Sequence, residues 1–404
     1  MLIAPSRLAG SIVIPSSKSH TLRALLFGLM GKGKTVVRSP LHCTDMEAML
    51  SAIIQCGALV ERYPDRIEII GGFTQCPERI DARNSGLVLR LMGALCALKS
   101  EPTHIIGDER RPVAPLVSAL RQLGAHAAAK EGILVRGPIK PGLARLSGED
   151  SQPVSALLIA ASFLEGKTEL VVDNPGETPW IELTLDWLRK VGARVSHDGY
   201  THYQIEGALS YNGFDYTVPG DFSSAAFPLA AALVTGSELV LENLCFSDPQ
   251  GDKELFFLLQ MMGAQLERSE RTVCVKPSTL IGRRIDVNAM IDALPILAVL
   301  GCYAEGQTEL VGGEIARHKE SDRIHGICTE LKKMGADIEE RPDGLVVRNS
   351  PLTGTTLYSH EDHRIALALA VAALGANGSS HIENSACISK TYPTFAYELD
   401  SLRI

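Results

Sequence analysis

Six stretches of the chain are almost entirely apolar after a short polar beginning. They cover residues 16–30, 83–95, 149–164, 220–234, 290–304 and 360–374. A helix that is apolar on every side is buried on every side. The pattern therefore predicts six core helices, each with a polar N-terminus.

Two markers repeat along the chain with nearly the same period. A Thr or Ser that opens an apolar strand recurs every 65 to 72 residues, at Thr35, Thr103, Thr168, Ser237, Thr308 and Ser380. A Gly-Ala pair recurs at the same interval, with its glycine at Gly57, Gly124, Gly192, Gly263 and Gly335. Glycine is the residue expected just after a helix C-terminus. The two markers together indicate six repeats of one structural unit.

Each repeat has the same predicted order: core helix, strand, second helix, then two strands, with one more strand leading in. We expect an α/β fold of six βαβαββ units, grouped as three units in each of two domains. Pro219-Gly220 is a plausible linker, and Pro15 stands in a similar position before the first repeat.

Composition narrows the function classes. The chain has 404 residues, a net charge of −8 and 5% aromatic residues, which argues against non-specific nucleic-acid binding and base stacking. No apolar run is long enough for a membrane span, and the first residues do not resemble a signal peptide. The nine cysteines form no CxxC pair, so we expect reduced thiols, no metal site and a cytoplasmic protein.

The polar starts of the core helices hold the candidate chemistry. Ser and Asp at these positions are explained by N-capping alone. Capping does not explain Lys18, Arg23, Arg90 or the pair His363-Arg364, because cations near a helix N-terminus oppose its dipole. An anionic ligand bound at these N-termini would account for both features.

A second charged group lies in the segment 315–327. Lys319 and Arg323 flank Glu320, and on a helix their spacing would place them on one face. A solvated surface is the competing interpretation. Arg110 and Arg111 before one helix, and Lys390 before another, are weaker signals of the same kind.

The motifs, taken in order, resemble the enolpyruvyl transferase family and, within it, the EPSP synthases. They are SSKSHTLRALL, RNSGLVLR, GDERRPVAPL, DSQPVSALL, PGDFSSAAF, IDALPILAVL, HKESDRI, EDHRIALALA and SKTYP. The resemblance implies a two-domain inside-out α/β barrel. Residues 17–220 would form the domain on the shikimate 3-phosphate side, and residues 1–16 with 221–404 the domain on the phosphoenolpyruvate and acid–base side.

The resemblance also implies a reaction. The enolpyruvyl group of phosphoenolpyruvate would pass to the 5-hydroxyl of shikimate 3-phosphate through a tetrahedral intermediate, without metal or organic cofactor. The implied catalytic residues are Lys18, Asp292 and Glu320, and which of them acts as base or as acid is open.

The implied binding residues fall into two sets. The shikimate 3-phosphate set is Lys18, Ser19, Arg23, Ser151, Gln152, Asp292 and Lys319. The phosphoenolpyruvate set is Lys18, Gly86, Arg111, Gln152, Arg323, Arg364 and Lys390, with Arg110 as the alternative to Arg111. We expect a monomer with these two small-molecule substrates and no nucleic-acid or membrane partner, and a cleft between domains that closes over the substrates.

Three positions depart from the family pattern. Leu87 stands where the family has Thr, Asp150 where it has Ser, and Glu177 or Thr178 near another expected Ser. A carboxylate beside a substrate phosphate is repulsive, so we expect Asp150 to point away, cap its helix or pair with a cation. Two alternatives stay open: the sister enzyme that acts on UDP-N-acetylglucosamine, and a non-catalytic anion-binding paralogue.

Overall fold

A computed structural model describes residues 1–108 and 112–404, in two compact units. Unit 1 comprises Met1–Pro15 and Pro219–Ile404, and unit 2 comprises Ser16–Val218. Each unit has its own apolar core. Within the described residues, no helix is both long enough and apolar enough to span a membrane.

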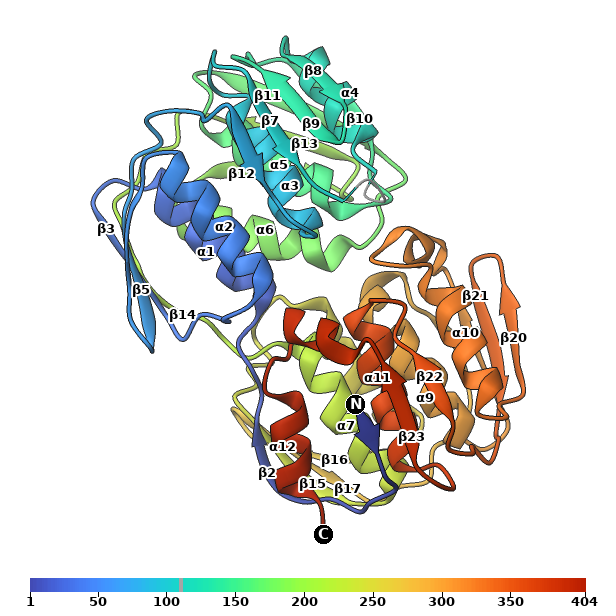
Figure 1. The fold of residues 1–404 in the computed structure, drawn as a ribbon. Coiled ribbons are helices and arrows are strands. Elements are labelled where there is room, and N and C mark those ends of the chain that lie inside the picture. Colours follow the sequence, from blue (N-terminus) through green and yellow to red (C-terminus); the bar gives the residue numbers. More distant parts are fainter. Residues whose placement is uncertain (109–111) are drawn as a thin grey trace. The chain divides into compact units, whose positions relative to one another are not determined.

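Unit 2 contains three four-stranded sheets of identical pattern (Figure 1). Their strand orders are β14-β3-β5-β4, β6-β7-β9-β8 and β10-β11-β13-β12. In each, the first strand pairs parallel to the second, and the other two pair antiparallel. The strand bounds are β3 Lys34–Arg38, β4 Leu59–Arg62, β5 Arg66–Ile70, β6 Arg79–Asp81, β7 Thr103–Ile106, β8 His126–Ala129, β9 Gly132–Arg136, β10 Leu143–Ser147, β11 Lys167–Asp173, β12 Arg194–Asp198, β13 His202–Glu206 and β14 Asp215–Thr217.

Unit 1 contains two sheets of the same pattern and a smaller third. Their orders are β16-β17-β15-β2, β18-β19-β21-β20 and β1-β23-β22. In the third sheet, β1 pairs antiparallel with β23 at the place where the other sheets have two further strands. The bounds are β1 Leu2–Ile3, β2 Ala9–Val13, β15 Glu238–Glu242, β16 Gln265–Arg268, β17 Thr272–Lys276, β18 Arg284–Asp286, β19 Gln307–Val311, β20 Ile338–Arg341, β21 Gly344–Arg348, β22 Thr356–Tyr358 and β23 Ser380–Glu383.

The six predicted core helices are present and buried. They are α1 Lys18–Met30, α3 Gly86–Cys96 and α5 Ser151–Ser162 in unit 2, and α7 Phe222–Thr235, α9 Leu294–Tyr303 and α11 His363–Leu374 in unit 1. The helix α11 packs against both α7 and α9, and α3 packs along α5. Their apolar bodies form the cores of their units, so their polar N-termini have fixed positions.

The second helix of each repeat packs outside the core helices. These helices are α2 Thr44–Gln55, α4 Ala114–Gln122, α6 Thr178–Lys190, α8 Glu254–Met261, α10 Arg323–Lys333 and α12 Phe395–Leu402. Five of them end before the Gly-Ala marker, and its glycine has a positive φ each time, as the sequence predicted. Short 3-10 helices precede some of them: η1 Gly251–Lys253, η3 Glu314–His318 and η4 Ser385–Lys390.

One core helix starts later than the sequence suggested. The predicted helix 290–304 begins only at Leu294, and residues Asn288–Ala293 form a 3-10 segment, η2, with a kink at Met290 (φ −135°). Asp292 therefore lies in a short irregular segment ahead of α9, where Pro295 takes a first-turn position that suits proline.

Two of the strands that join sheets far from their own position in the sequence pair parallel with their new neighbour. Strand β2 pairs parallel with β15, so that Ala9 lies opposite Glu238. Strand β14 pairs parallel with β3, so that Asp215 lies opposite Val36. Each supplies the leading strand that the first repeat of its unit would otherwise lack.

Candidate active-site clusters at the helix N-termini

Side-chain capping is present at five of the six core helices. Ser17, Ser85, Asp150, Asp221 and Asp362 each accept a hydrogen bond from a backbone N–H of the first turn. The capping interpretation is therefore confirmed for these helices. Capping does not explain the cations near these helix starts. The cations form one cluster in each unit.

In unit 2, Lys18 pairs with an acid from the neighbouring helix. Its Nζ lies 3.4 Å from Oδ2 of Asp45, near the start of α2. The hydroxyl of Ser85 donates to the same oxygen at 2.9 Å. Asp45 is buried, so the carboxylate connects the starts of α1 and α3 and fixes the ammonium of Lys18 between them.

Arg90 connects α3 with α5. Its guanidinium lies 2.9 Å from Oδ2 of Asp150 and donates to Oε1 of Gln152 at 3.0 Å. Asp150 also caps α5 by accepting from the N–H of Gln152 at 2.9 Å. Both outcomes expected for Asp150, capping and pairing with a cation, are found together.

Arg23 is buried in unit 2 and bonds to neutral groups. Its Nε and Nη2 donate to the hydroxyl of Thr184 at 3.1 and 2.8 Å, and Nη1 donates to the carbonyl of Ser19 at 3.2 Å. Burial lowers the pKa of Arg23 to about 9. Among the described residues, no carboxylate forms an ion pair with Arg23, so an anionic ligand would stabilise its charge.

The N-terminus of α5 receives a second carboxylate. Glu177, the residue before α6, accepts from both the N–H and the hydroxyl of Ser151, at 3.2 and 3.1 Å. Glu177 is 1% exposed, and its backbone is left-handed, with φ 48° and ψ 38°. The predicted substrate residue Ser151 is thus already bonded to an acid of the protein.

In unit 1, Arg323 is surrounded by three carboxylates. It lies 2.6 Å from Asp292, 2.7 Å from Glu320 and 2.8 Å from Asp362. Its side chain is 1% exposed, and these acids raise its pKa despite the opposing effect of burial. The structure therefore brings three predicted residues, Asp292, Glu320 and Arg323, into direct contact.

Two further predicted cations complete this cluster. Arg364 donates to Oδ2 of Asp292 at 3.2 Å, and Lys390 donates to Oε1 of Glu320 at 3.2 Å. Within the described part of the chain, the buried Nε and Nη1 atoms of Arg364 meet no acceptor. Unused donors on a buried guanidinium are suited to a carboxylate or phosphate ligand.

The charges of the cluster shift the pKa values of two acids, Asp292 and the buried Asp252. Burial raises the pKa of Asp292, but Arg364, Arg323 and Lys319 outweigh it and hold the pKa below its usual range. Burial, assisted by the negative charge of Asp292, raises the pKa of Asp252 to about 7. Asp252 accepts a hydrogen bond from Ser223, at the start of α7.

The predicted helical relationship between Lys319 and Arg323 is wrong. Lys319 lies at the end of η3, outside α10, with φ −86° and ψ −140°. Asp322 caps α10 by accepting from the N–H of His325 at 3.0 Å, so the helix begins at Arg323. The cap at Asp322, and not the i, i+4 spacing, determines where the helix begins. Lys319 still acts on the charge of Asp292.

The remaining predicted residues lie at the expected helix starts or outside the described residues. Ser19 lies in the first turn of α1, and Gly86 is the first residue of α3. Arg110 and Arg111 fall in the gap between residues 108 and 112, so the choice between them stays a prediction.

Sequence reasoning missed two acids that organise the clusters. Asp45 bonds Lys18 and Ser85, and Asp362 bonds Arg323 and caps α11. Asp45 opens a second helix and Asp362 precedes a core helix, so each has the sequence signature of an ordinary helix start. Nothing in the sequence separates these acids from simple caps, because their cation partners are distant along the chain.

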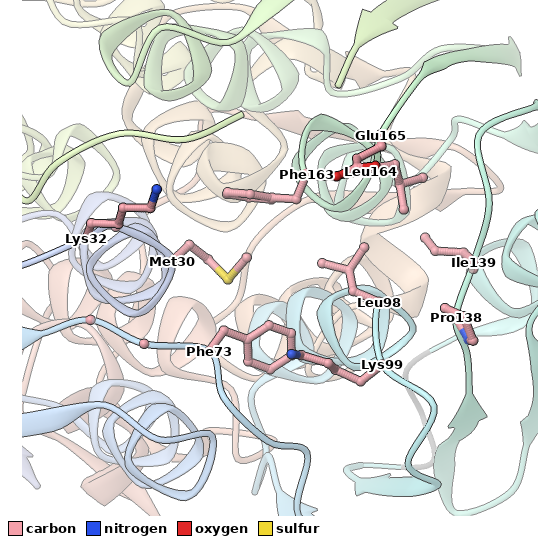
Figure 2. A pocket seen from close by; sticks show the side chains of 13 residues that line it. Met30, Lys32, Phe73, Leu98, Lys99, Pro138, Ile139, Phe163, Leu164 and Glu165 are labelled. Atoms are coloured by element: carbon pink, nitrogen blue, oxygen red, sulfur yellow. The ribbon is translucent and has the colours of Figure 1, made fainter. Parts of the chain in front are cut away.

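Unit 2 also has a cavity at the opposite ends of its core helices. It has a volume of about 510 Å³ and lies where α1, α3 and α5 end, lined by Met30, Phe73, Leu98, Ile139 and Phe163 with Lys32 and Lys99 (Figure 2). None of the predicted site residues that the structure describes lines it. The cavity is therefore separate from the polar N-termini.

Comparison with known proteins decides the family. A sequence model described as EPSP synthase (3-phosphoshikimate 1-carboxyvinyltransferase) matches residues 2–399. The chain belongs to the EPSP synthase family. A relative from Chlamydia caviae named 3-phosphoshikimate 1-carboxyvinyltransferase is 44% identical, over 99% of this chain and 93% of the relative. A protein of the same name from Acetivibrio thermocellus is 39% identical, over 97% of this chain and 96% of the relative.

Solved structures show the same fold. An EPSP synthase from Acinetobacter baumannii superposes with a TM-score of 0.83 and 27% identity, covering 100% of this chain and 98% of that one. The enolpyruvyl transferase NikO from Streptomyces tendae has a TM-score of 0.80 at 18% identity, over 99% and 96% of the two chains. The EPSP synthase resemblance and the inside-out α/β fold are confirmed.

Proposed function

We propose that this EPSP synthase family member transfers the enolpyruvyl group of phosphoenolpyruvate to the 5-hydroxyl of shikimate 3-phosphate. The products are 5-enolpyruvylshikimate 3-phosphate and inorganic phosphate, as required for chorismate and aromatic amino-acid synthesis. Full-length relatives with this activity in their names support the assignment. The observation that carries it structurally is the contact of Asp292 and Glu320 with the buried Arg323.

The chemistry needs a proton on the methylene carbon, a base for the attacking hydroxyl, and a proton returned during elimination. Lys18, Asp292 and Glu320 are the groups we propose for these transfers. Arg364, Arg323 and Lys319 hold the pKa of Asp292 below its usual range, and its carboxylate can accept a hydroxyl proton once a substrate changes its contacts with arginine. Glu320, bonded to Lys390 at 3.2 Å, and Lys18 are the partners for the methylene proton.

Phosphoenolpyruvate brings a carboxylate and a phosphate, which require several cations. We propose that Arg323, Arg364 and Lys390 bind it, together with Arg111, Gly86 and Gln152. The unused donors of Arg364 support this role. Bidentate pairing of guanidinium with carboxylate or phosphate fixes orientation as well as charge.

For shikimate 3-phosphate, we propose contacts from Ser19, Arg23, Ser151, Gln152 and Lys319, together with Lys18 and Asp292. Arg23 is the strongest support for an anion in unit 2, because among the described residues its buried charge is bonded to neutral groups alone. A phosphate near the starts of α1 and α5 would supply the negative charge.

We further propose that the protein acts in the cytoplasm as a monomer. All nine cysteines are unpaired thiols, as expected in a reducing compartment. Light scattering of the purified protein tests the monomer, since a dimer would double the measured mass.

Phosphate release is the direct test. The purified protein is mixed with shikimate 3-phosphate and phosphoenolpyruvate in the absence of added metal, and phosphate is measured. Release that requires both substrates is the expected result. If a folded protein releases none, calorimetry with shikimate 3-phosphate separates a non-catalytic binder from a protein with another acceptor, such as UDP-N-acetylglucosamine.

A further inference from the structure

Within the described residues, the backbone donors of Ser151 and Gln152 at the start of α5 already bond to carboxylates. The N–H of Ser151 donates to Glu177 and the N–H of Gln152 donates to Asp150, while the next residue, Pro153, has no N–H. The hydroxyl of Ser151 also donates to Glu177. Two carboxylates of the protein itself thus occupy the helix end at which we propose that a phosphate binds.

The two carboxylates differ in how they are held. Asp150 is the N-cap, and it forms an ion pair with the buried Arg90 at 2.9 Å. Glu177 reaches α5 from the start of α6, across a turn whose left-handed backbone directs its side chain to Ser151. Replacement of Asp150 would break both the cap and the ion pair, whereas replacement of Glu177 leaves both in place.

We propose that Glu177 is a specificity-determining residue that occupies the anion site of α5 until the acceptor phosphate displaces it. The inference rests on the proposed function, because it takes the phosphate of shikimate 3-phosphate as the competing anion. Carboxylate and phosphate need the same donors on Ser151, and two like charges at one helix end repel each other. Glu177 therefore weakens binding of the acceptor through its phosphate and leaves the contacts with the rest of the acceptor unchanged.

The test compares Glu177→Gln with the wild-type protein. Glutamine keeps an oxygen that can accept from Ser151 but removes the charge. We expect the KM for shikimate 3-phosphate to fall on the order of tenfold, with kcat and the KM for phosphoenolpyruvate within twofold of wild type. Glu206→Gln is the matched control, because Glu206 lies on the exposed side of β13 and its replacement also removes one negative charge.

A second variant and a second ligand make the result specific. Glu177→Gly tolerates the left-handed backbone and removes the side chain, so it too should lower the KM for shikimate 3-phosphate. Calorimetry with unphosphorylated shikimate should give equal affinities for wild type and Glu177→Gln, since that ligand has no phosphate.

The outcomes separate this inference from the proposed function. Turnover of the wild-type protein decides the function by itself. If the wild type turns over but both Glu177 variants show an unchanged or higher KM for shikimate 3-phosphate, the inference is overturned and the function stands. An equal gain in affinity for shikimate would also overturn it, because the effect would not depend on the phosphate.

Discussion

Nη1 of Arg323 lies 2.6 Å from Oδ1 of Asp292, and this contact joins the start of α10 to the segment before α9. While the guanidinium is bonded to this carboxylate and, with Arg364 and Lys319, holds its pKa low, Asp292 is a weak base. A substrate carboxylate that binds Arg323 would loosen the contact and raise the basicity of Asp292. The contact between Arg323 and Asp292 thus couples substrate binding to the basicity of the proposed base.

Asp292→Asn should retain the fold and lose most of the turnover. Asparagine keeps the shape and one acceptor for Arg323, but it cannot take up the hydroxyl proton. We expect kcat to fall by about 10²–10⁴-fold, measured as phosphate release at saturating substrates. Asp337→Asn is the control, because Asp337 pairs with Arg348 at the surface. Wild-type kcat in Asp292→Asn would remove this residue from the mechanism.

Arg364→Lys should weaken binding of phosphoenolpyruvate. Lysine keeps the charge but loses the planar set of donors, including the Nε and Nη1 atoms that meet no acceptor among the described residues. We expect the KM for phosphoenolpyruvate to rise roughly 10- to 100-fold, the loss of one hydrogen bond to a charged group. Arg348→Lys serves as the surface control. A KM equal to that of the wild type would show that phosphoenolpyruvate does not bind these atoms.

Asp252 should make stability depend on pH. Its pKa rises from 3.8 in the unfolded chain to about 7 in the folded protein. Between these values the folded state binds a proton that the unfolded state releases, so the contribution of Asp252 to stability falls as the pH rises through this window. The loss is at most about 4 kcal/mol.

The variant Asp252→Asn removes this titration while keeping an acceptor for Ser223. Urea unfolding at pH 5 and at pH 8 should show the variant gaining stability relative to wild type at the higher pH. Asp400→Asn, at an exposed ion pair with Arg403, should show no such gain. The same free-energy difference at both pH values would contradict the shifted pKa.

Gly301→Ala should destabilise unit 1. A Cβ at this position in α9 would lie 2.3 Å from Cγ1 of Val347 and 3.1 Å from Cβ of Thr308. Both neighbours are β-branched and lie on strands, so they adjust poorly, and we expect a cost of about 1–3 kcal/mol. Thermal unfolding measures it.

Gly28→Ala in α1 is the matched comparison for the same position in the first repeat. There the Cβ would meet Cδ1 of Ile69 at 2.7 Å, and this atom is the flexible end of its side chain. The cost should be smaller than for Gly301→Ala. An equal or larger loss of stability at Gly28 would contradict the packing explanation.

Much of the fold could be predicted because its signals are local and repeated. The Thr and Ser markers and the Gly-Ala pairs depend only on neighbouring residues, and six copies make each copy more certain. The behaviour of Asp150 could also be anticipated, because a carboxylate at a helix start has few favourable arrangements. The start of α9 could not, since a proline in the first turn is compatible with a helix beginning on either side of Asp292.

The contacts inside the clusters could not be predicted from the sequence. Asp45 bonds Lys18, and Glu177 bonds Ser151, across separations of 27 and 26 residues. Such pairs depend on how the core helix and the second helix of one repeat pack, which no local pattern encodes. The predicted helical relationship between Lys319 and Arg323 is wrong for the opposite reason. Their i, i+4 spacing is a local pattern, but Asp322 between them caps α10, so Lys319 lies outside the helix.

The pairing of β2 with β15 has a consequence for the order of assembly during synthesis. The strands of unit 2 lie between Lys34 and Thr217, so its sheets can be completed while the ribosome is still producing the rest. Strands β1 and β2 precede unit 2 in the sequence, but β2 must wait for Glu238, and β1 must wait for β23, at Ser380–Glu383. Strands β1 and β2 therefore find their partners only after the whole of unit 2 has been made, and until then their unpaired edges are exposed to aggregation.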